Sequence, residues 1–270
     1  MTTTSEVLPE PAAVRPAGLA SAISDALVLT ERNLIGYVRI PQALFFSTVQ
    51  PVMFVLLFRY VFGGAIATPG MSYVDYLMPG IFVQTVMFGA VSTSIGLAED
   101  LQKGLVERFR SLPMASSAVL AGRTTADACR NVFVLVLITI VGFLVGFRVH
   151  TDALAYLAAF GLMLLFAYAL SWGFAIIGLS APNSETAQLM SFPVLFPLVF
   201  ASTAFVPAQT MPSWLQPFAE HQPVSVVVNA VRALTQGGPT ARWVIPAILW
   251  SVGLLVVLMP LAVRRYRRSV

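Results

Sequence analysis

Residues 99–123 are the only long polar interruption of an otherwise apolar sequence, and their charged side chains are the first candidates for chemistry. This stretch opens with Glu99 and Asp100 and carries Arg108 and Arg110 towards its far end, the order of charges that the macrodipole of a short helix favours. On such a helix the apolar residues share one face, which predicts a binding role. The helix either binds another protein or lies in the lipid headgroup layer. The apolar face consists of Leu101, Leu105, Phe109 and Leu112, and Lys103, Glu107 and Arg110 lie off it.

Catalytic and metal-binding chemistry has few candidate residues. Cys129 is the single cysteine, so the chain cannot form an internal disulfide, and we expect this side chain to be small, apolar and buried. The two histidines, His150 and His221, have no neighbours at metal-ligand spacing. We therefore expect no catalytic residue, no metal site and no cofactor in this chain.

Ion-coupled transport and ATP hydrolysis also lack their usual residues. We expect all twelve Asp and Glu residues in tails, loops or the edges of membrane spans, whereas proton- and sodium-coupled carriers usually place carboxylates within the membrane. The phosphate-binding loop G-x-x-x-x-G-K-[ST] needs a Gly-Lys pair, but the sole lysine, Lys103, follows Gln102. If ATP drives this protein, another chain binds the ATP and the Mg²⁺.

The composition places the elements around these residues in a membrane. Hydrophobic residues make up 57% of the chain and charged residues 10%, which excludes an ordinary soluble domain. The net charge of +4 does not point to nucleic acid, because the basic residues lie between apolar spans and in the cluster Arg264, Arg265, Arg267 and Arg268. We expect an all-α integral membrane protein.

Six apolar stretches are long enough to cross a bilayer as helices, since about twenty residues at ~1.5 Å each cover a hydrocarbon core of ~30 Å. Pro193 and Pro197 should kink the fifth of these helices and free backbone carbonyls. The expected transmembrane domain, residues 21–270, has spans at about 43–62, 77–98, 128–147, 153–179, 187–205 and 243–263.

Three further segments complete the expected architecture. Residues 1–20 are rich in Pro, Ala and Thr and predict a disordered cytoplasmic tail and not a cleaved signal peptide. Residues 21–40 carry an apolar stripe that ends before Pro41, which predicts an interfacial helix. Residues 207–237 contain recurring prolines yet stay apolar with helical spacing, which predicts two short re-entrant helices in the outer leaflet between the fifth and sixth spans.

The basic residues predict the orientation of the chain. With the N-terminus in the cytoplasm and six spans, twelve of the sixteen Lys and Arg residues lie on the cytoplasmic side. Of the others, Arg148, Arg232 and Arg242 lie outside and Arg59 lies within the first span. Both termini and the polar stretch after the second span are therefore expected in the cytoplasm.

Three stretches of the sequence resemble a known family. The pattern D-L-x-K-G-x-x-E-R-F-R-S-L-P at residues 100–113, followed by Gly122 and Arg123, is similar to the cytoplasmic loop of type-2 ABC exporter permeases, especially the daunorubicin-resistance type of actinobacteria. Residues 204–234 resemble the external segment of the same family, and residues 60–66 are a third match.

The resemblance implies a half-transporter in a bacterial plasma membrane. It would pair with a second permease copy or a related permease and with a separate nucleotide-binding subunit, and it would bind no nucleic acid. Residues 99–112 would be the coupling helix, which packs its apolar face into a groove on the ATPase. ATP-driven closure of the ATPase subunits would then be transmitted to the permease as a push on this helix. The implied coupling residues are Glu99, Asp100, Leu101, Gly104, Leu105, Glu107, Arg108, Phe109, Arg110, Leu112 and Pro113.

Candidates for a translocation path are polar or soft apolar residues along the spans. Hydrogen bonds between packed helices and ordinary lipid contact also explain such residues, and the arginine among them either snorkels to the headgroups or lines an exit for anionic cargo. The candidates are Gln50, Met53, Arg59, Gln84, Met87, Phe88 and Phe196, and Trp214, Glu220 and His221 form either an outer gate or a simple turn.

The expected function is that of a transport subunit, not an enzyme, in an ATP-driven exporter of hydrophobic or amphipathic small molecules, either drug-like compounds or lipids. One alternative is export of a lipid-linked glycan or glycolipid, which would need a ladder of aromatic and hydrogen-bonding residues, and no dense ladder is evident in the sequence. The alternatives of other classes are a stand-alone ion-coupled carrier or channel, which would transport without an ATPase, and a membrane scaffold without cargo.

Overall fold

The computed structural model describes residues 19–39, 41–64, 66, 68, 70–105 and 116–268, and all regular structure among these residues is helical. Four helices are long and apolar enough to cross a membrane: α3 (Tyr73–Gln102), α5 (Ser116–Leu144), α6 (Ala153–Gly178) and α10 (Thr240–Arg268). Length and composition therefore support a multi-pass membrane protein.

Two further apolar helices are shorter. The first is α2 (Pro41–Leu57), which continues into the π-helical turn η1 (Phe58–Phe62), and the second is α7 (Ser184–Phe200). They occupy the stretches where the sequence predicts the first and fifth spans. The count of six crossings stays a prediction, because these two helices are shorter than the other four.

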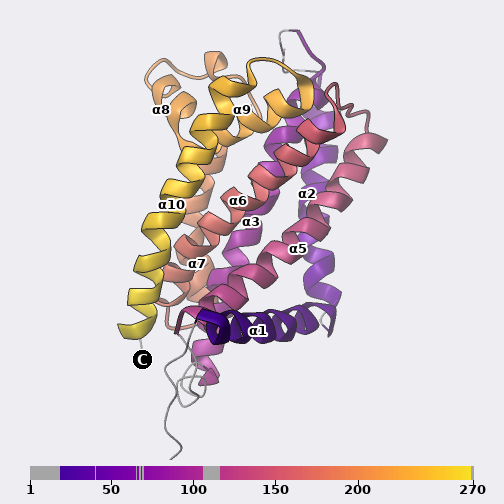
Figure 1. The fold of residues 1–270 in the computed structure, drawn as a ribbon. Coiled ribbons are helices and arrows are strands. Elements are labelled where there is room, and N and C mark those ends of the chain that lie inside the picture. The colour runs from indigo at the N-terminus through magenta and orange to yellow at the C-terminus, as the bar shows by residue number, and fades with distance from the viewer. Residues whose placement is uncertain are drawn as a thin grey trace, which may run out of the picture.

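Helix α3 forms the centre of the bundle and is buried along most of its length (Figure 1). Two glycine contacts show how closely its neighbours approach. A Cβ at Gly178 of α6 would lie 2.4 Å from the carbonyl oxygen of Ser94, and a Cβ at Gly80 would lie 2.0 Å from that of Ala204. Backbone atoms therefore occupy the space of a side chain at both positions, which fixes α3 against α6 and against the segment after α7.

Helix α1 (Leu19–Arg39) lies across one end of the bundle, the end at which α10 also terminates (Figure 1). It packs against the beginning of α5, where the hydroxyl of Thr30 donates to the carbonyl of Gly122 at 3.2 Å. We call this the α1 end.

The opposite end carries η2 (Ala208–Thr210), α8 (Gln216–His221) and α9 (Pro223–Gln236) (Figure 1). We call it the α8 end. The sequence predicts two half-helices over residues 207–237, and the structure has the six-residue α8 followed by the fourteen-residue α9. Nearly every residue of α9 is buried, because it packs against α3, α6 and α10.

Helix α5 corrects two expectations. It begins at Ser116, well before the expected start of the third span at residue 128, so Asp127 lies inside a long apolar helix and is fully buried. The expectation that every carboxylate lies in a tail, a loop or the edge of a span is therefore wrong. The expectation of a buried Cys129 is also wrong, because this side chain points away from the packed face of α5 and is exposed.

Candidate functional site

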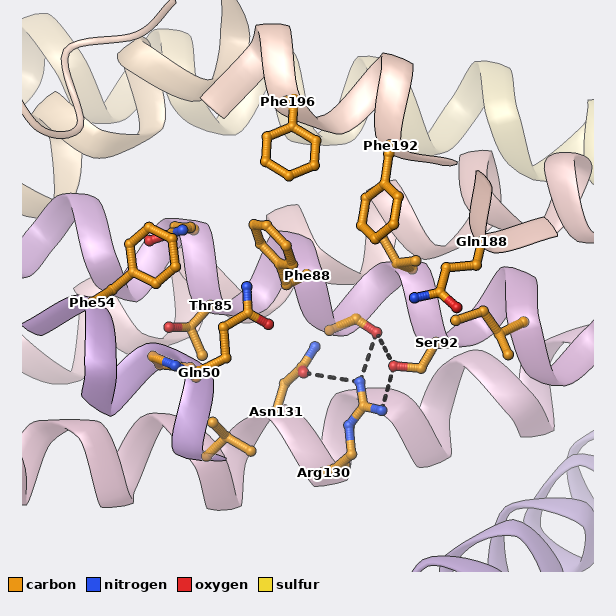
Figure 2. Close-up of a pocket in the computed structure, with 16 residues that line it drawn as sticks. Gln50, Phe54, Thr85, Phe88, Ser92, Arg130, Asn131, Gln188, Phe192 and Phe196 are labelled. Atoms are coloured by element: carbon orange, nitrogen blue, oxygen red, sulfur yellow. Dashed lines mark hydrogen bonds between the residues drawn. The ribbon is translucent and has the colours of Figure 1, made fainter. Parts of the chain in front are cut away.

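Helices α2, α3, α5 and α7 line a cavity of about 310 Å³ (Figure 2). Its apolar wall is dominated by four phenylalanines, and the ring of Phe88 meets that of Phe196 edge-on with centroids 6.1 Å apart. Its polar wall consists mainly of neutral amide and hydroxyl groups. The aromatic residues are Phe54, Phe88, Phe192 and Phe196, and the polar residues are Gln50, Gln84, Thr85, Ser92, Arg130, Asn131 and Gln188.

One buried polar atom of this cavity has no hydrogen-bond partner among the described residues. The side chain of Gln84 is 4% exposed, and its Oε1 atom accepts no hydrogen bond. A buried acceptor without a donor costs about 1–3 kcal/mol, so the site is incomplete as a purely structural arrangement. The neighbouring Thr85, by contrast, donates its hydroxyl to the carbonyl of Ile81 at 2.7 Å.

Arg130, which supplies the positive charge in the cavity lining, forms its hydrogen bonds with protein groups. Its guanidinium donates to the hydroxyl of Ser92, to the carbonyl of Gly89 at 2.6 Å and to Asn131 Oδ1 at 3.5 Å (Figure 2). Its Nη1 atom also lies 3.8 Å from Asp127. The cavity therefore presents an arginine whose charge is already balanced.

Asp127 is the centre of a buried charged cluster, which we define as Asp100, Arg123, Asp127 and Arg130. Arg123 bridges the two carboxylates, with Nη1 3.8 Å from Asp100 Oδ2 and Nε 3.8 Å from Asp127 Oδ2. Arg32 of α1 lies 3.6 Å from Asp100. The cluster connects α1, the end of α3 and the beginning of α5 to the Arg130 side of the cavity.

Hydrogen bonds from two hydroxyl groups complete the surroundings of Asp127. Tyr37 of α1 donates to Oδ1 and Thr93 of α3 donates to Oδ2. Burial, together with the negative charge of Asp127, raises the pKa of Tyr37 to about 12, so the phenol keeps its proton at neutral pH. Tyr37 is therefore a stable donor, and both carboxylate oxygens are satisfied.

The charged cluster depends on a glycine of α3. A Cβ at Gly96 would lie 1.6 Å from the Nη2 atom of Arg123, so the guanidinium occupies the space that any other residue would fill. The same guanidinium donates to the carbonyl of Ser92 at 3.3 Å. Gly96 thus allows Arg123 to lie against α3.

The implied coupling residues fall at the end of α3 and beyond it. Glu99 pairs with Lys103 on the surface, whereas Asp100 belongs to the charged cluster. Gly104 adopts a positive φ of 65°, a conformation that favours glycine, and this ends the helix. Leu101 and Leu105 are half-buried, and Glu107, Arg108, Phe109, Arg110, Leu112 and Pro113 lie outside the described residues.

The candidates for the translocation path separate into two groups. Gln50, Gln84, Phe88 and Phe196 line the cavity together. Three others lie elsewhere: Met53 is exposed on the outside of α2, Met87 is fully buried in the core, and Arg59 lies in the turn η1 with its guanidinium 5.9 Å from the ring of Tyr60.

The candidates for an outer gate lie at the α8 end. Glu220 and His221 line a second cavity of about 280 Å³ together with Arg242 and Trp243, whereas Trp214 is 78% exposed and lies outside it. The ring nitrogen Nδ1 of His221 is 2.9 Å from the carbonyl oxygen of Pro217 one turn earlier.

Sequence reasoning missed several residues of the site. Arg130 and Asn131 line the cavity and Asp127 anchors the charged cluster, although the sequence analysis gave none of them a role. The signal was available: Arg123, Asp127 and Arg130 recur at helical spacing, which places them on one face of α5. Gln188 of α7 carried no comparable signal, whereas Phe192 lies four residues before Phe196, which the sequence analysis had singled out.

These features define a class of protein. The cavity lies between four apolar helices, of which α3 and α5 are long enough to cross a membrane, in a bundle with two further such helices, α6 and α10. The described residues hold no group of three or more His, Cys, Asp or Glu side chains placed to bind a metal ion. This is the architecture of a multi-pass membrane transport protein. Residues 25–235 match the family model of the ABC-2 type transporters, and the chain belongs to that family.

Several relatives carry more specific names. The chain is 36% identical, over 94% of its length and 90% of the relative's, to the daunorubicin resistance ABC transporter permease protein DrrB1 of Streptomyces coeruleorubidus. It is 30% identical, over 77% of its length and 74% of the relative's, to the doxorubicin resistance ABC transporter permease protein DrrB of Mycobacterium tuberculosis. A probable doxorubicin resistance permease, DrrC of the same organism, is 27% identical over 100% of this chain and 99% of its own. The family resemblance found in the sequence is thereby confirmed.

Proposed function

We propose that this chain is the permease subunit of an ATP-driven exporter that moves hydrophobic or amphipathic small molecules outward across a bacterial plasma membrane. The cavity between α2, α3, α5 and α7 is the observation that carries this proposal. It combines four phenylalanine rings with neutral polar groups, the lining that an amphipathic cargo requires. The names of the relatives, which refer to anthracycline resistance, support a drug-like cargo.

The α1 end is the cytoplasmic end in this proposal. The arginines of the last turn of α10 and the charged residues at the end of α3 lie there, as the excess of positive charge in cytoplasmic segments requires. The coupling helix would follow α3 directly. The charged cluster then lies between the contact with the ATPase and the cavity, which its member Arg130 lines, so a push on the end of α3 would reach the cargo site through packed side chains.

The buried Asp127 bears on the alternative of an ion-coupled carrier. A carboxylate that binds and releases an ion needs free lone pairs, but both oxygens of Asp127 accept hydrogen bonds and two guanidiniums lie 3.8 Å away. This arrangement supports a structural ion pair and not an ion-coupling site. The energy would then come from a separate nucleotide-binding subunit that binds ATP and Mg²⁺, and a second permease copy or a related permease would complete the complex.

Transport in inside-out vesicles tests the proposal. With the chain and its nucleotide-binding subunit together, we expect ATP-dependent accumulation of daunorubicin, and with the chain alone we expect none. The variant Leu105→Glu places a charge on the apolar face of the coupling segment and should abolish co-purification with the ATPase without loss of membrane insertion. Gln102→Glu, an exposed change three residues earlier, is the matched control. Accumulation by the chain alone would reject the proposal in favour of an independent carrier.

A further inference from the structure

Eight phenylalanine rings form a continuous series through this protein, which we call the phenylalanine track. Phe54, Phe58 and Phe62 recur every four residues in α2 and η1, so they share one face of that helix. A second set with the same spacing lies on α7. The track consists of Phe54, Phe58, Phe62, Phe88, Phe192, Phe196, Phe200 and Phe205.

Adjacent rings of the track are in contact. Along α7, the centroids of Phe196 and Phe200 are 5.6 Å apart with ring planes only 9° from parallel, and Phe192 lies 5.4 Å from Phe196. Phe205 connects the two helices, because its ring lies 5.5 Å from Phe200 and stacks on Phe58 at 4.6 Å and 8°. The sequence analysis found no dense aromatic ladder, and the fold assembles one from separate helices.

The track begins in the cavity and leads away from it. Phe88 and Phe192 line the cavity, whereas Phe62 lies at the far end of η1, beside the loop before α3. The rings are not sealed inside the core: Phe196, Phe200 and Phe62 are each between 41% and 43% exposed. A flat molecule therefore has accessible ring surfaces along this series, with the buried Phe205 as its rigid centre.

Two features of the cavity indicate which polar groups and which charge the cargo should have. The Oε1 atom of Gln84 is buried without a donor, and a hydroxyl or N–H group on a bound molecule would satisfy it. Among the described residues, Arg130 is the only charged side chain that lines the cavity, and it is already paired with Asp127 and bonded to Ser92. A hydrogen-bond donor on the cargo therefore has a specific acceptor, and an anion has no unbalanced cation.

We propose that the cavity and the phenylalanine track form one path for planar aromatic molecules that carry a hydrogen-bond donor. This inference rests on the proposed export function and names its substrate class. Gln84 accepts the donor in the cavity, and the exposed rings of Phe196, Phe200 and Phe62 contact the aromatic part of the cargo towards the α8 end. The stacked pair of Phe205 and Phe58 lies between these rings and holds the track together. Phenylalanine has no hydroxyl or indole N–H, so the track itself cannot hydrogen-bond a sugar chain.

Three probes separate the features of this path in vesicles that hold the complete complex. Daunorubicin is planar and carries donors, a trimethylammonium amphiphile with a pyrenyl tail is planar without a donor, and dodecyltrimethylammonium has neither feature. ATP-dependent export of each probe is measured for the wild type and for variants that reach wild-type levels in the membrane. If the wild type exports none of them, the proposed function itself fails, whatever the variants do.

The variant Phe196→Leu removes one ring of the track. We expect kcat/KM to fall about tenfold for both planar probes and to change less than about twofold for dodecyltrimethylammonium, because only the planar probes lose a stacking surface. Phe196→Trp keeps an aromatic face and should retain export of the planar probes. Phe143→Leu is the matched control: that ring is 41% exposed and stacks on Phe147, but it lies on α5 away from the track.

The variant Gln84→Met keeps the length of the side chain and removes the acceptor. We expect it to lower kcat/KM about tenfold for daunorubicin and to leave both probes without a donor within about twofold. Equal losses for all three probes, or losses no larger than those of Phe143→Leu, would overturn the assignment of this path. If Phe196→Leu is not produced, Phe200→Leu removes the adjacent ring and gives the same test.

Discussion

Two buried arginine sites at opposite ends of the bundle are built in different ways. At the α1 end, Arg123 and Arg130 lie within 3.8 Å of Asp127, and Arg123 lies at the same distance from Asp100. At the α8 end, Arg232 of α9 is equally buried, but the contacts it makes with described residues include no carboxylate.

Arg232 is held by dipoles and by an aromatic face. Its guanidinium donates from Nη2 to the carbonyls of Tyr76 and Thr203, both at 3.0 Å, and from Nη1 to Asn229 Oδ1 at 2.6 Å. It also lies 3.7 Å from the centre of the Tyr76 ring. One side chain thus joins α9 to α3 and to the segment after α7, where the track passes through Phe205.

The two ends of the bundle therefore differ in how easily their side chains can move. The charged cluster consists of opposite charges on side chains, which can shift together while the cluster stays neutral. Three of the four hydrogen bonds that Arg232 makes with described residues go to backbone carbonyls, whose positions are fixed by the fold. We infer that the α1 end is suited to transmitting movement and the α8 end to resisting it.

The largest expected effect is at the charged cluster. Asp127→Asn removes the fully buried anion, so that Arg130 loses its carboxylate partner and Arg123 keeps only Asp100. We therefore expect the free energy of unfolding to fall by about 3–5 kcal/mol. A denaturation titration of the purified protein with sodium dodecyl sulfate measures this loss. Asp25→Asn on α1 is the control and should change the free energy by less than about 0.5 kcal/mol. A small effect at Asp127 would remove the contrast between the two ends.

A smaller effect is expected at Arg232. Arg232→Gln removes the bonds that the guanidinium donates to the carbonyls of Tyr76 and Thr203, although Thr203 still accepts from the Tyr76 hydroxyl at 3.1 Å, and it leaves no opposing charge. We therefore expect a loss of about 1–3 kcal/mol in the same titration. Arg232→Lys should recover only part of this loss, because an ammonium lacks the planar fork that reaches both carbonyls. A loss as large as that of Asp127→Asn would show that charge, and not hydrogen bonding, decides stability at the α8 end.

The smallest effect is expected on the surface of the α1 end. Glu99 and Lys103 pair one turn apart, but 49% of the Glu99 side chain and 60% of the Lys103 side chain are exposed. Glu99→Gln should therefore change the free energy of unfolding by less than about 0.5 kcal/mol, and less still at high salt. Titrations at two salt concentrations would check this. A large effect would mean that the stability of this end does not depend on burial.

The sequence predicts the outline of this protein well. Length and hydropathy predict the positions of α3, α6 and α10, because a membrane span must be long and apolar. The start of α5 was placed too late, because the charges of Arg123, Asp127 and Arg130 resemble the end of a span. Their mutual pairing, which only the fold reveals, is what allows them to lie inside a helix.

The candidate site was predictable only in part. Composition identified Gln84 and Phe196 as candidates but could not separate them from Met53 and Met87, because the rotation of each helix decides which side chains enter the cavity. The spacing of the phenylalanines is visible in the sequence. Their union into one track is not, because it depends on where Phe205 lies after α7 ends.

The close approach of Arg123 to Gly96 predicts that these two positions covary among homologues. An added methyl group at position 96 would displace the flexible end of the arginine and not the helix backbone, and the guanidinium would leave both aspartates at once. A homologue with a bulkier residue at position 96 should therefore carry a shorter side chain at position 123. Gly96 preserves these ion pairs because it has no side chain. A substitution at position 96 should therefore be tolerated only together with a substitution at position 123.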